Sequence, residues 1–215
     1  MNQARSVLVF LIATMAFSPG CGRKAVDEID FGTVNNSVYQ NEYFGLTVDL
    51  PPEWSIQDQE ARQRMTELGG KMVAGDDKNL KAAVKASEMT TVNLFAAFKH
   101  PVGTPVPYNP NIMCLAERVR HVPGIKKGED YLFHSKKLLE SSQMQVSFPK
   151  EMTTEAIGGI QFGVMHTAMS MAGMTIRQKY YAAIIKGYAL VFIVSFTTEE
   201  EESALEDVLK TIAFK

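Results

Sequence analysis

Two largely apolar stretches near the C-terminal end of the chain predict a β-hairpin. Residues 176–185 and 188–196 are both rich in apolar side chains, and Lys186 and Gly187 separate them. A two-residue connection of this kind is typical of hairpins. In the second stretch the residues on both faces of the strand are apolar, whereas a strand with one solvent-exposed face would alternate between apolar and polar residues. We therefore expect this hairpin to lie at the centre of a sheet that is covered on both faces.

A helix is predicted directly after the hairpin, over residues 199–210. Thr197 and Glu200 have the spacing of a capping box, as do Thr198 and Glu201, and the acidic first turn suits the positive end of the helix dipole. Five apolar residues follow at helical spacing and predict a buried stripe. These residues are Ala204, Leu205, Val208, Leu209 and Ile212.

The other elements predict an α+β domain that extends and covers this hairpin. An alternating strand over residues 43–50 ends at two prolines, and Gly69-Gly70 is expected to end the first helix. Further helices are predicted over residues 58–68, 77–86 and 129–142, and strands over 91–99, 111–120, 144–148, 154–157 and 161–171. Hairpin connections between the late strands predict a mostly antiparallel central sheet with helices on both faces, in one domain over residues 42–215.

The N-terminal segment has a different character. Arg5 precedes an apolar run over residues 7–17, and Gly20 stands directly before Cys21. This arrangement resembles the lipobox of bacterial lipoproteins, although Ser18 stands where that family usually has an aliphatic residue. The resemblance implies that residues 1–20 are a signal peptide, that Cys21 carries the lipid, and that polar residues 21–41 form a tether.

Cleavage after Ala16, with Thr14 and Ala16 as the small residues, is the competing interpretation, and it predicts a secreted soluble protein. With lipid on Cys21, the protein is expected in the cell envelope, facing the periplasm or on the outer membrane. The formal net charge is −2, and the sequence has no strongly basic block. We therefore expect no nucleic-acid partner, and the lipid rather than the domain would supply the membrane attachment.

Two parts of the chain resemble the PsbP-like superfamily. The first is the segment YFGLTVDLPPEW over residues 43–54, and the second combines Arg177, Tyr180, the Gly187 turn and the ending Ile-Ala-Phe over residues 212–214. The resemblance implies an α/β/α sandwich and a protein that binds other proteins rather than catalysing a reaction.

Residue types that carry chemistry are scattered, so we expect no catalytic, cofactor or metal site. Cys114 has apolar neighbours and is expected to be a core thiol rather than a nucleophile. Met169 and Met171 share a strand face, where core packing is favoured over copper binding. The four histidines lack the spacing of metal ligands. They are His100, His121, His134 and His166.

A proline-rich loop is the best candidate for binding. Four of the eleven residues over 100–110 are proline, which predicts a stiff surface loop between two strands. His100, Tyr108, Asn109 and Asn111 are the candidate contact residues, and Tyr108 could act as an anchor. The loop could equally serve only to connect the strands.

These features favour a lipid-anchored envelope protein with a non-catalytic binding or accessory role towards another envelope protein. Two alternatives stay open. One is a carrier of a small apolar ligand, which requires an enclosed cavity between the sheet and a helix layer. The other is a small enzyme whose residues converge only in three dimensions.

Overall fold

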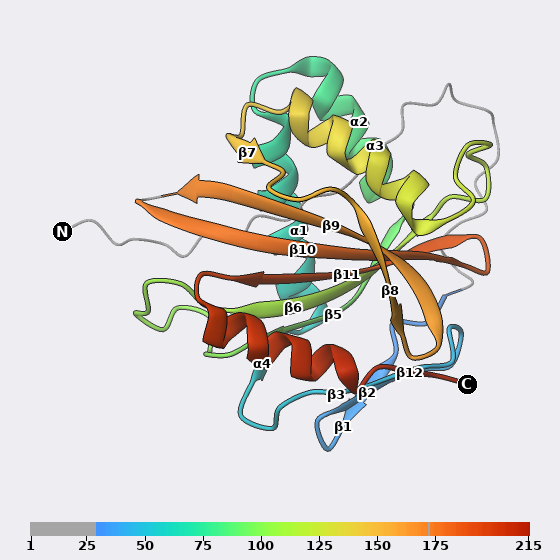
Figure 1. Cartoon of the computed structure of the whole chain (residues 1–215), viewed down its shortest axis with the longest axis vertical. Coiled ribbons are helices and arrows are strands. Elements are labelled where there is room, and N and C mark those ends of the chain that lie inside the picture. The colour runs from blue at the N-terminus through green and yellow to red at the C-terminus, as the bar shows by residue number, and fades with distance from the viewer. Residues whose placement is uncertain (1–28, 172) are drawn as a thin grey trace.

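The computed structural model describes residues 29–171 and 173–215 (Figure 1). It confirms the predicted α+β class, with helices on both faces of a large sheet in which every described strand pair is antiparallel. The predicted signal peptide, the predicted lipid-bearing Cys21 and the first part of the predicted tether lie outside the described residues. Among the described helices, none combines the length and the apolar character that a membrane crossing requires.

The described residues form these elements in chain order. The helices are α1 (Gln59–Ala74), α2 (Lys78–Glu88), α3 (Gly128–Ser141) and α4 (Glu199–Lys210). The strands are β1 (Thr33–Asn35), β2 (Val38–Asn41), β3 (Leu46–Asp49), β4 (Ser55–Ile56), β5 (Thr91–Phe98), β6 (Asn111–Arg118), β7 (Val146–Ser147), β8 (Thr153–Ile157), β9 (Ile160–Met171), β10 (Met174–Ile185), β11 (Tyr188–Phe196) and β12 (Ala213–Phe214).

The strands form two sheets that are stacked with the helices. The large sheet has the order β4-β5-β6-β11-β10-β9-β7, with β8 also paired to β9, and the small sheet has the order β1-β2-β3-β12. Helices α2 and α3 lie above the large sheet in Figure 1, whereas α4 and the small sheet lie below it. The core is correspondingly divided between these two faces, and α1 packs on the same face as α2 and α3.

The β10–β11 hairpin lies at the centre of the large sheet, as the sequence predicts. Ile185 pairs with Tyr188 across the turn, and Lys186 and Gly187 both have positive φ, at 50° and 82°. Two successive residues with positive φ are typical of the type I′ turn, whose twist suits adjacent strands. All nine residues of β11 are buried. The absence of alternation in this stretch therefore marks a strand covered on both faces.

The predicted C-terminal end of the first helix is wrong, because α1 continues through Gly69-Gly70 to Ala74. A Cβ atom at Gly70 would lie 2.7 Å from Val84 Cγ1 on α2. A glycine inside a helix costs about 1 kcal/mol relative to alanine, but here it permits close packing of two helices. Gly75 follows the last helical residue as the C-cap, and its φ of +50° favours glycine.

The predicted tether is too long at its C-terminal end. Residues 29–41 belong to the folded domain, since they include β1 and β2 of the small sheet. Tyr39 is almost fully buried, and Asn41 Nδ2 donates to the backbone oxygen of Asp30 at 2.9 Å. This segment did not resemble a folded region in the sequence, because its two short antiparallel strands direct few side chains into the core and are otherwise polar.

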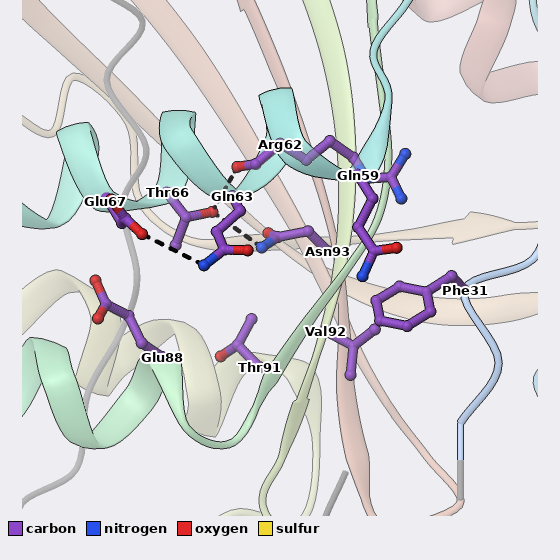
Figure 2. A pocket seen from close by; sticks show the side chains of 10 residues that line it. All are labelled: Phe31, Gln59, Arg62, Gln63, Thr66, Glu67, Glu88, Thr91, Val92 and Asn93. Atoms are coloured by element: carbon purple, nitrogen blue, oxygen red, sulfur yellow. Dashed lines mark hydrogen bonds between the residues drawn. The ribbon is translucent and has the colours of Figure 1, made fainter. Parts of the chain in front are cut away.

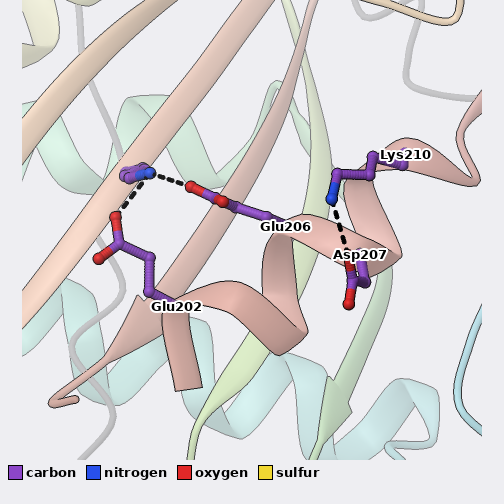
Figure 3. A network of polar contacts seen from close by, with 5 residues as sticks. Glu202, Glu206, Asp207 and Lys210 are labelled. Carbon is purple, nitrogen blue, oxygen red and sulfur yellow. Dashed lines mark hydrogen bonds and ion pairs between the residues drawn. The ribbon is translucent and has the colours of Figure 1, made fainter. Parts of the chain in front are cut away.

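Helix α4 is joined to the large sheet by Lys179 of β10. The side chain of Lys179 is only 10% exposed, and its Nζ lies 2.7 Å from a carboxylate oxygen of Glu202 and 2.6 Å from one of Glu206. Figure 3 shows these two glutamates extending from α4 toward a common ion-pair partner. Burial by itself would lower the pKa of Lys179, but the hydrogen bonds to the two carboxylates raise it.

We expect Lys179→Met to lower the free energy of unfolding by about 1–2 kcal/mol, because two partly buried glutamates lose their shared cation. Lys210→Met is the matched control, since Lys210 forms an exposed pair with Asp207 on the same helix (Figure 3). Urea denaturation monitored by circular dichroism measures both effects. Equal, small losses in the two variants would show that the Lys179 ion pairs do not hold α4 on the sheet.

Candidate functional site

A pocket of about 220 Å³ opens between α1, the end of α2 and the start of β5. Figure 2 shows the side chains that line it. They are Phe31, Gln59, Arg62, Gln63, Thr66, Glu67, Glu88, Thr91, Val92 and Asn93. Among these lining residues, amides, hydroxyls and charged groups outnumber apolar side chains, but apolar atoms form the larger part of the exposed lining, so the pocket suits a ligand with both polar and apolar groups.

The pocket is built by helical spacing on α1 and by the strand beside it. Gln59, Arg62, Gln63, Thr66 and Glu67 recur at intervals of three and four residues, which places them on one face of the helix. The start of β5 forms the opposite wall, and the segment before β1 adds the ring of Phe31 at one end (Figure 2). Three segments that are distant in the sequence therefore meet at the pocket.

Hydrogen bonds fix several of the lining side chains. Asn93 Nδ2 donates to Thr66 Oγ1 at 2.9 Å, and the Thr66 hydroxyl donates to the backbone oxygen of Arg62 at 3.1 Å. Gln63 Nε2 also contacts Glu67 Oε1 at 3.4 Å along the helix. The wall between strand and helix is thus organised before any ligand binds, which lowers the entropy cost of binding.

Arg62 supplies the positive end of the pocket. Its Nη1 donates to the backbone oxygen of Gln57 at 2.8 Å, while its buried Nε has no hydrogen-bond partner among the described residues. Within the described part of the chain, no carboxylate lies within 4.0 Å of its guanidinium nitrogens. Burial lowers the pKa of Arg62, although the group stays charged at neutral pH. Arg62 is therefore a cation with unused donor capacity.

Glu67 and Glu88 supply the negative end. Figure 2 shows both carboxylates at the end of the pocket opposite Arg62 and Phe31. Burial, and then the charge of Glu67, raise the pKa of Glu88. The charges of Lys85 and Lys71 oppose this shift, and a further cation beside Glu88 would oppose it more, because it would favour the charged carboxylate. The pocket is consequently dipolar along its length.

Three of the four side chains that the sequence singled out in the proline-rich loop are buried, whereas His100 is half-buried. Tyr108 and Asn109 are 8% and 7% exposed, and Asn111 is fully buried. The Asn109 side chain closes the base of the loop, since it accepts from the His100 backbone N–H at 2.9 Å and donates to the His100 oxygen at 2.7 Å. Burial raises the pKa of Tyr108 to about 12. These groups hold the loop from within, and its exposed tip includes Val102.

The structure also places the other chemistry-bearing residues. Cys114 is 1% exposed in the core, and burial raises the pKa of its thiol well above the ordinary value. Met169 is buried, and Met171 packs against the same core cluster. In the described ranges, no group of three or more His, Cys, Asp or Glu side chains is placed to hold a metal ion.

Neither a family model nor a curated protein matches this chain. Solved structures that are similar to it include the following two. The solution structure of cyanobacterial PsbP from Synechocystis sp. PCC 6803 is 10% identical, with a TM-score of 0.49, and the match covers 92% of this chain and 98% of that one. A Pseudomonas aeruginosa protein of unknown function is 14% identical, with a TM-score of 0.38, and covers 49% and 74% of the two chains. No binding or activity of this protein follows from these similarities.

A buried carboxylate, Glu117, was missed by the sequence reasoning. It accepts hydrogen bonds from the Tyr131 hydroxyl at 2.7 Å and from the Ser87 hydroxyl at 3.2 Å, and so joins β6 to α3 and α2. Burial raises the pKa of Glu117 to about 7, although the two hydrogen bonds oppose that shift. Its strand parity predicts that it shares a face with Leu115 and Met113, which was the available signal.

This raised pKa predicts that stability falls as pH rises. The folded state binds the Glu117 proton more tightly than the unfolded chain, whose glutamate pKa is near 4.5. The stabilisation is complete below that value and is lost through about pH 7, a change of about 3 kcal/mol at most. Glu117→Gln stays neutral and should remove this loss.

Urea denaturation of both proteins at about pH 5 and about pH 8 measures the difference. Glu155→Gln, on the exposed face of β8, serves as the control for removing a carboxylate. If Glu117→Gln and the unaltered protein lose the same stability between the two pH values, Glu117 is not the group responsible.

Proposed function

We propose that this protein is a non-catalytic binding domain of the cell envelope, held at a membrane by lipid on Cys21. Its pocket between α1 and β5 is where it contacts another envelope protein. The half-buried Arg62, which lines this pocket and has no carboxylate within 4.0 Å of its guanidinium in the described part of the chain, is the observation that carries this proposal. A guanidinium at a pocket without a carboxylate partner favours a ligand that supplies one.

The position of the pocket suits a partner near the membrane. Ile29 is buried where the described domain begins, and Phe31, two residues later, lines the pocket. An extended chain spans at most about 3.3–3.6 Å per residue, so the eight steps from Cys21 to Ile29 reach roughly 30 Å. A lipid on Cys21 would then keep the pocket within a few tens of ångströms of the bilayer surface.

The character of the lining favours a protein segment over the other candidate ligand. A small apolar ligand needs an enclosed apolar cavity, whereas this pocket is lined by charged groups, amides and hydroxyls. Surface-exposed polar groups of this kind are common where proteins meet through a mixed apolar and polar interface. The exposed ring of Phe31 supplies the apolar part.

The intact mass of the protein extracted from its native membrane tests the anchor. We expect a chain that begins at Cys21 and carries the added mass of acyl chains, because the segment before it resembles a lipobox. The Cys21→Ser variant should lose the acyl mass and leave the membrane fraction. An unlipidated chain that begins at Phe17 would overturn the anchor and favour a secreted protein.

Site-specific photo-crosslinking in intact cells tests the pocket. A crosslinking residue at Gln63, which lines the pocket and is exposed, should give a defined product with an envelope protein. The same residue at Glu155 of β8 should give none. Arg62→Gln should weaken the Gln63 product, whereas Arg64→Gln, which removes a charge from the same helix outside the pocket, should not. A product from Val102 instead of Gln63 would move the interface to the proline-rich loop and contradict the pocket assignment.

A further inference from the structure

The pocket between α1 and β5 lies at an edge of the large sheet. One wall comes from α1, which packs on one face of the sheet. Phe31 comes from the other face, where its backbone oxygen accepts from the Tyr39 hydroxyl at 2.9 Å. The third wall is the start of β5 itself (Figure 2). A space that is bounded from both faces of a sheet and by one of its strands lies beside that strand.

The start of β5 is paired on one side only among the described strands. Strand β6 runs along one side, and on the other side β4 pairs only with Ala97 and Phe98. The backbone N–H of Gln57 then donates to the Ala96 oxygen at 2.9 Å, and the chain turns into α1. No described strand continues along Thr91–Asn93 on that side.

The strand register determines which backbone groups point to the pocket side. The Thr90 oxygen accepts from the Arg118 backbone N–H at 3.0 Å, so Thr90 faces β6. Successive residues of a strand direct their backbone groups to alternate sides, so Thr91 and Asn93 face outward and Val92 faces β6. A bulge after Asn93 then shifts the register with β6. The edge therefore offers two N–H groups and two carbonyl oxygens.

On the basis of the proposed binding function, we infer that the partner contributes an extended segment that pairs with Thr91–Asn93 as an additional strand of the large sheet. Addition of a strand to an open edge is a common way to bind a peptide, because the backbone hydrogen bonds supply affinity and alternate side chains supply specificity. In the antiparallel geometry of every described pair, two residues of the segment would exchange four hydrogen bonds with Thr91 and Asn93.

The two edges of the large sheet differ in how they are protected. At the far edge, β7 is two residues long and is followed closely by Pro149 and Lys150. Short strands, prolines and lysines all keep sheet edges from pairing with other chains. Residues 91–94 of β5 read Thr-Val-Asn-Leu, with neither a charge nor a proline. The β-branched side chains of Thr91 and Val92 also suit a paired strand.

The side chains of this segment are already held by the two layers. The Asn93 amide is bonded to Thr66 of α1, and the Thr91 hydroxyl lies 3.4 Å from the Ser87 hydroxyl on α2. Val92 is buried in the core on the other face of the sheet. An added strand can therefore pair with the backbone while these side-chain contacts stay in place.

The two sides of the pocket predict an alternating sequence in the segment. Side chains directly opposite Thr91 and Asn93 would share their face of the sheet, beside the amides of Gln59 and Gln63 on α1 (Figure 2). The side chains between them would point to the other face, where Phe31 supplies an apolar ring. We therefore expect polar residues, whose backbone pairs with the edge, to alternate with apolar ones.

Capped synthetic peptides with selected N-methyl groups test this inference. The parent probe is acetylated and amidated Lys-Val-Thr-Val-Thr-Val-Lys. One relative carries N-methyl groups on its two threonines, and the other carries them on its last two valines. The protein is the chain from residue 21 onward with Cys21→Ser, which retains every described residue. Binding is followed by the backbone amide NMR signals and hydrogen exchange of Thr91, Val92 and Asn93.

In the free protein, we expect the amides of Thr91 and Asn93 to exchange quickly and that of Val92 to be protected by β6. The parent peptide should shift and protect the Thr91 and Asn93 amides. Methylated threonines should weaken binding about tenfold or more, because two hydrogen bonds to the edge are lost. Methylated valines, whose nitrogens point away from the edge, should change binding by no more than about twofold.

A pair of protein variants at one position gives the matched control. Asn93→Pro and Asn93→Ala both remove the side-chain bond to Thr66, but only proline removes the outward N–H. Proline is tolerated in edge strands where the N–H faces outward. We expect Asn93→Pro to abolish peptide binding and Asn93→Ala to retain it. Unchanged amide signals of β6 and β11 establish that each variant is folded.

Equal binding of the two methylated peptides, or unshifted Thr91 and Asn93 amides at millimolar peptide, would overturn the inference. Protection of these amides in the free protein would also overturn it. Protection that rises with protein concentration would assign the edge to a second copy, and protection at every concentration would assign it to the chain itself.

The cellular crosslink separates this inference from the proposed function. A Gln63 crosslink together with a failed peptide test would leave the binding function in place and remove only the strand pairing. Selective peptide binding without any crosslink would retain the strand pairing and contradict the envelope-protein partner.

Discussion

The structure depends on the burial of both faces of the β10–β11 hairpin. A strand with apolar side chains on both faces must be covered twice, since each exposed apolar face would cost about 25 cal/mol per Å². Here α1, α2 and α3 cover one face, while α4 and the small sheet cover the other. The chain order follows from this requirement, because the first strands and the last helix must meet on the same side of the hairpin. Strand β12 completes that contact by pairing with β3.

Buried polar groups fix the positions of the helices on the two faces of the large sheet. Glu117 joins two helices to one face, and Lys179 joins α4 to the other. A further polar row crosses the central strands, where Ser195 lies opposite Asn111 and Gln178, and Gln178 donates to the Ser195 hydroxyl at 2.7 Å. An apolar contact tolerates sliding, whereas a buried hydrogen bond has one geometry. These groups thus favour one placement of the helices on the sheet over placements that are shifted along it.

The pocket lies at the periphery of the fold, where α1, the start of β5 and the segment before β1 meet. Its walls are supported by groups with structural tasks of their own, such as the Asn93–Thr66 hydrogen bond and the close contact of Gly70 with α2. Its charged ends are exposed enough to meet a partner. Binding sites often combine a rigid wall, which belongs to the scaffold, with exposed charged side chains that can adapt to a partner.

The sequence by itself determined the central hairpin, the capped helix α4, the α+β class and the core position of Cys114, because these depend on local periodicity, turn residues and capping. The tertiary structure alone decided the length of α1, since Gly70, one of the two glycines expected to end the helix, instead accommodates Val84 of α2. It also decided that Tyr108 and Asn109 face inward and that Arg62 and Glu88 share a pocket. Those outcomes depend on contacts between segments distant in the chain, and no local pattern encodes which segments become neighbours.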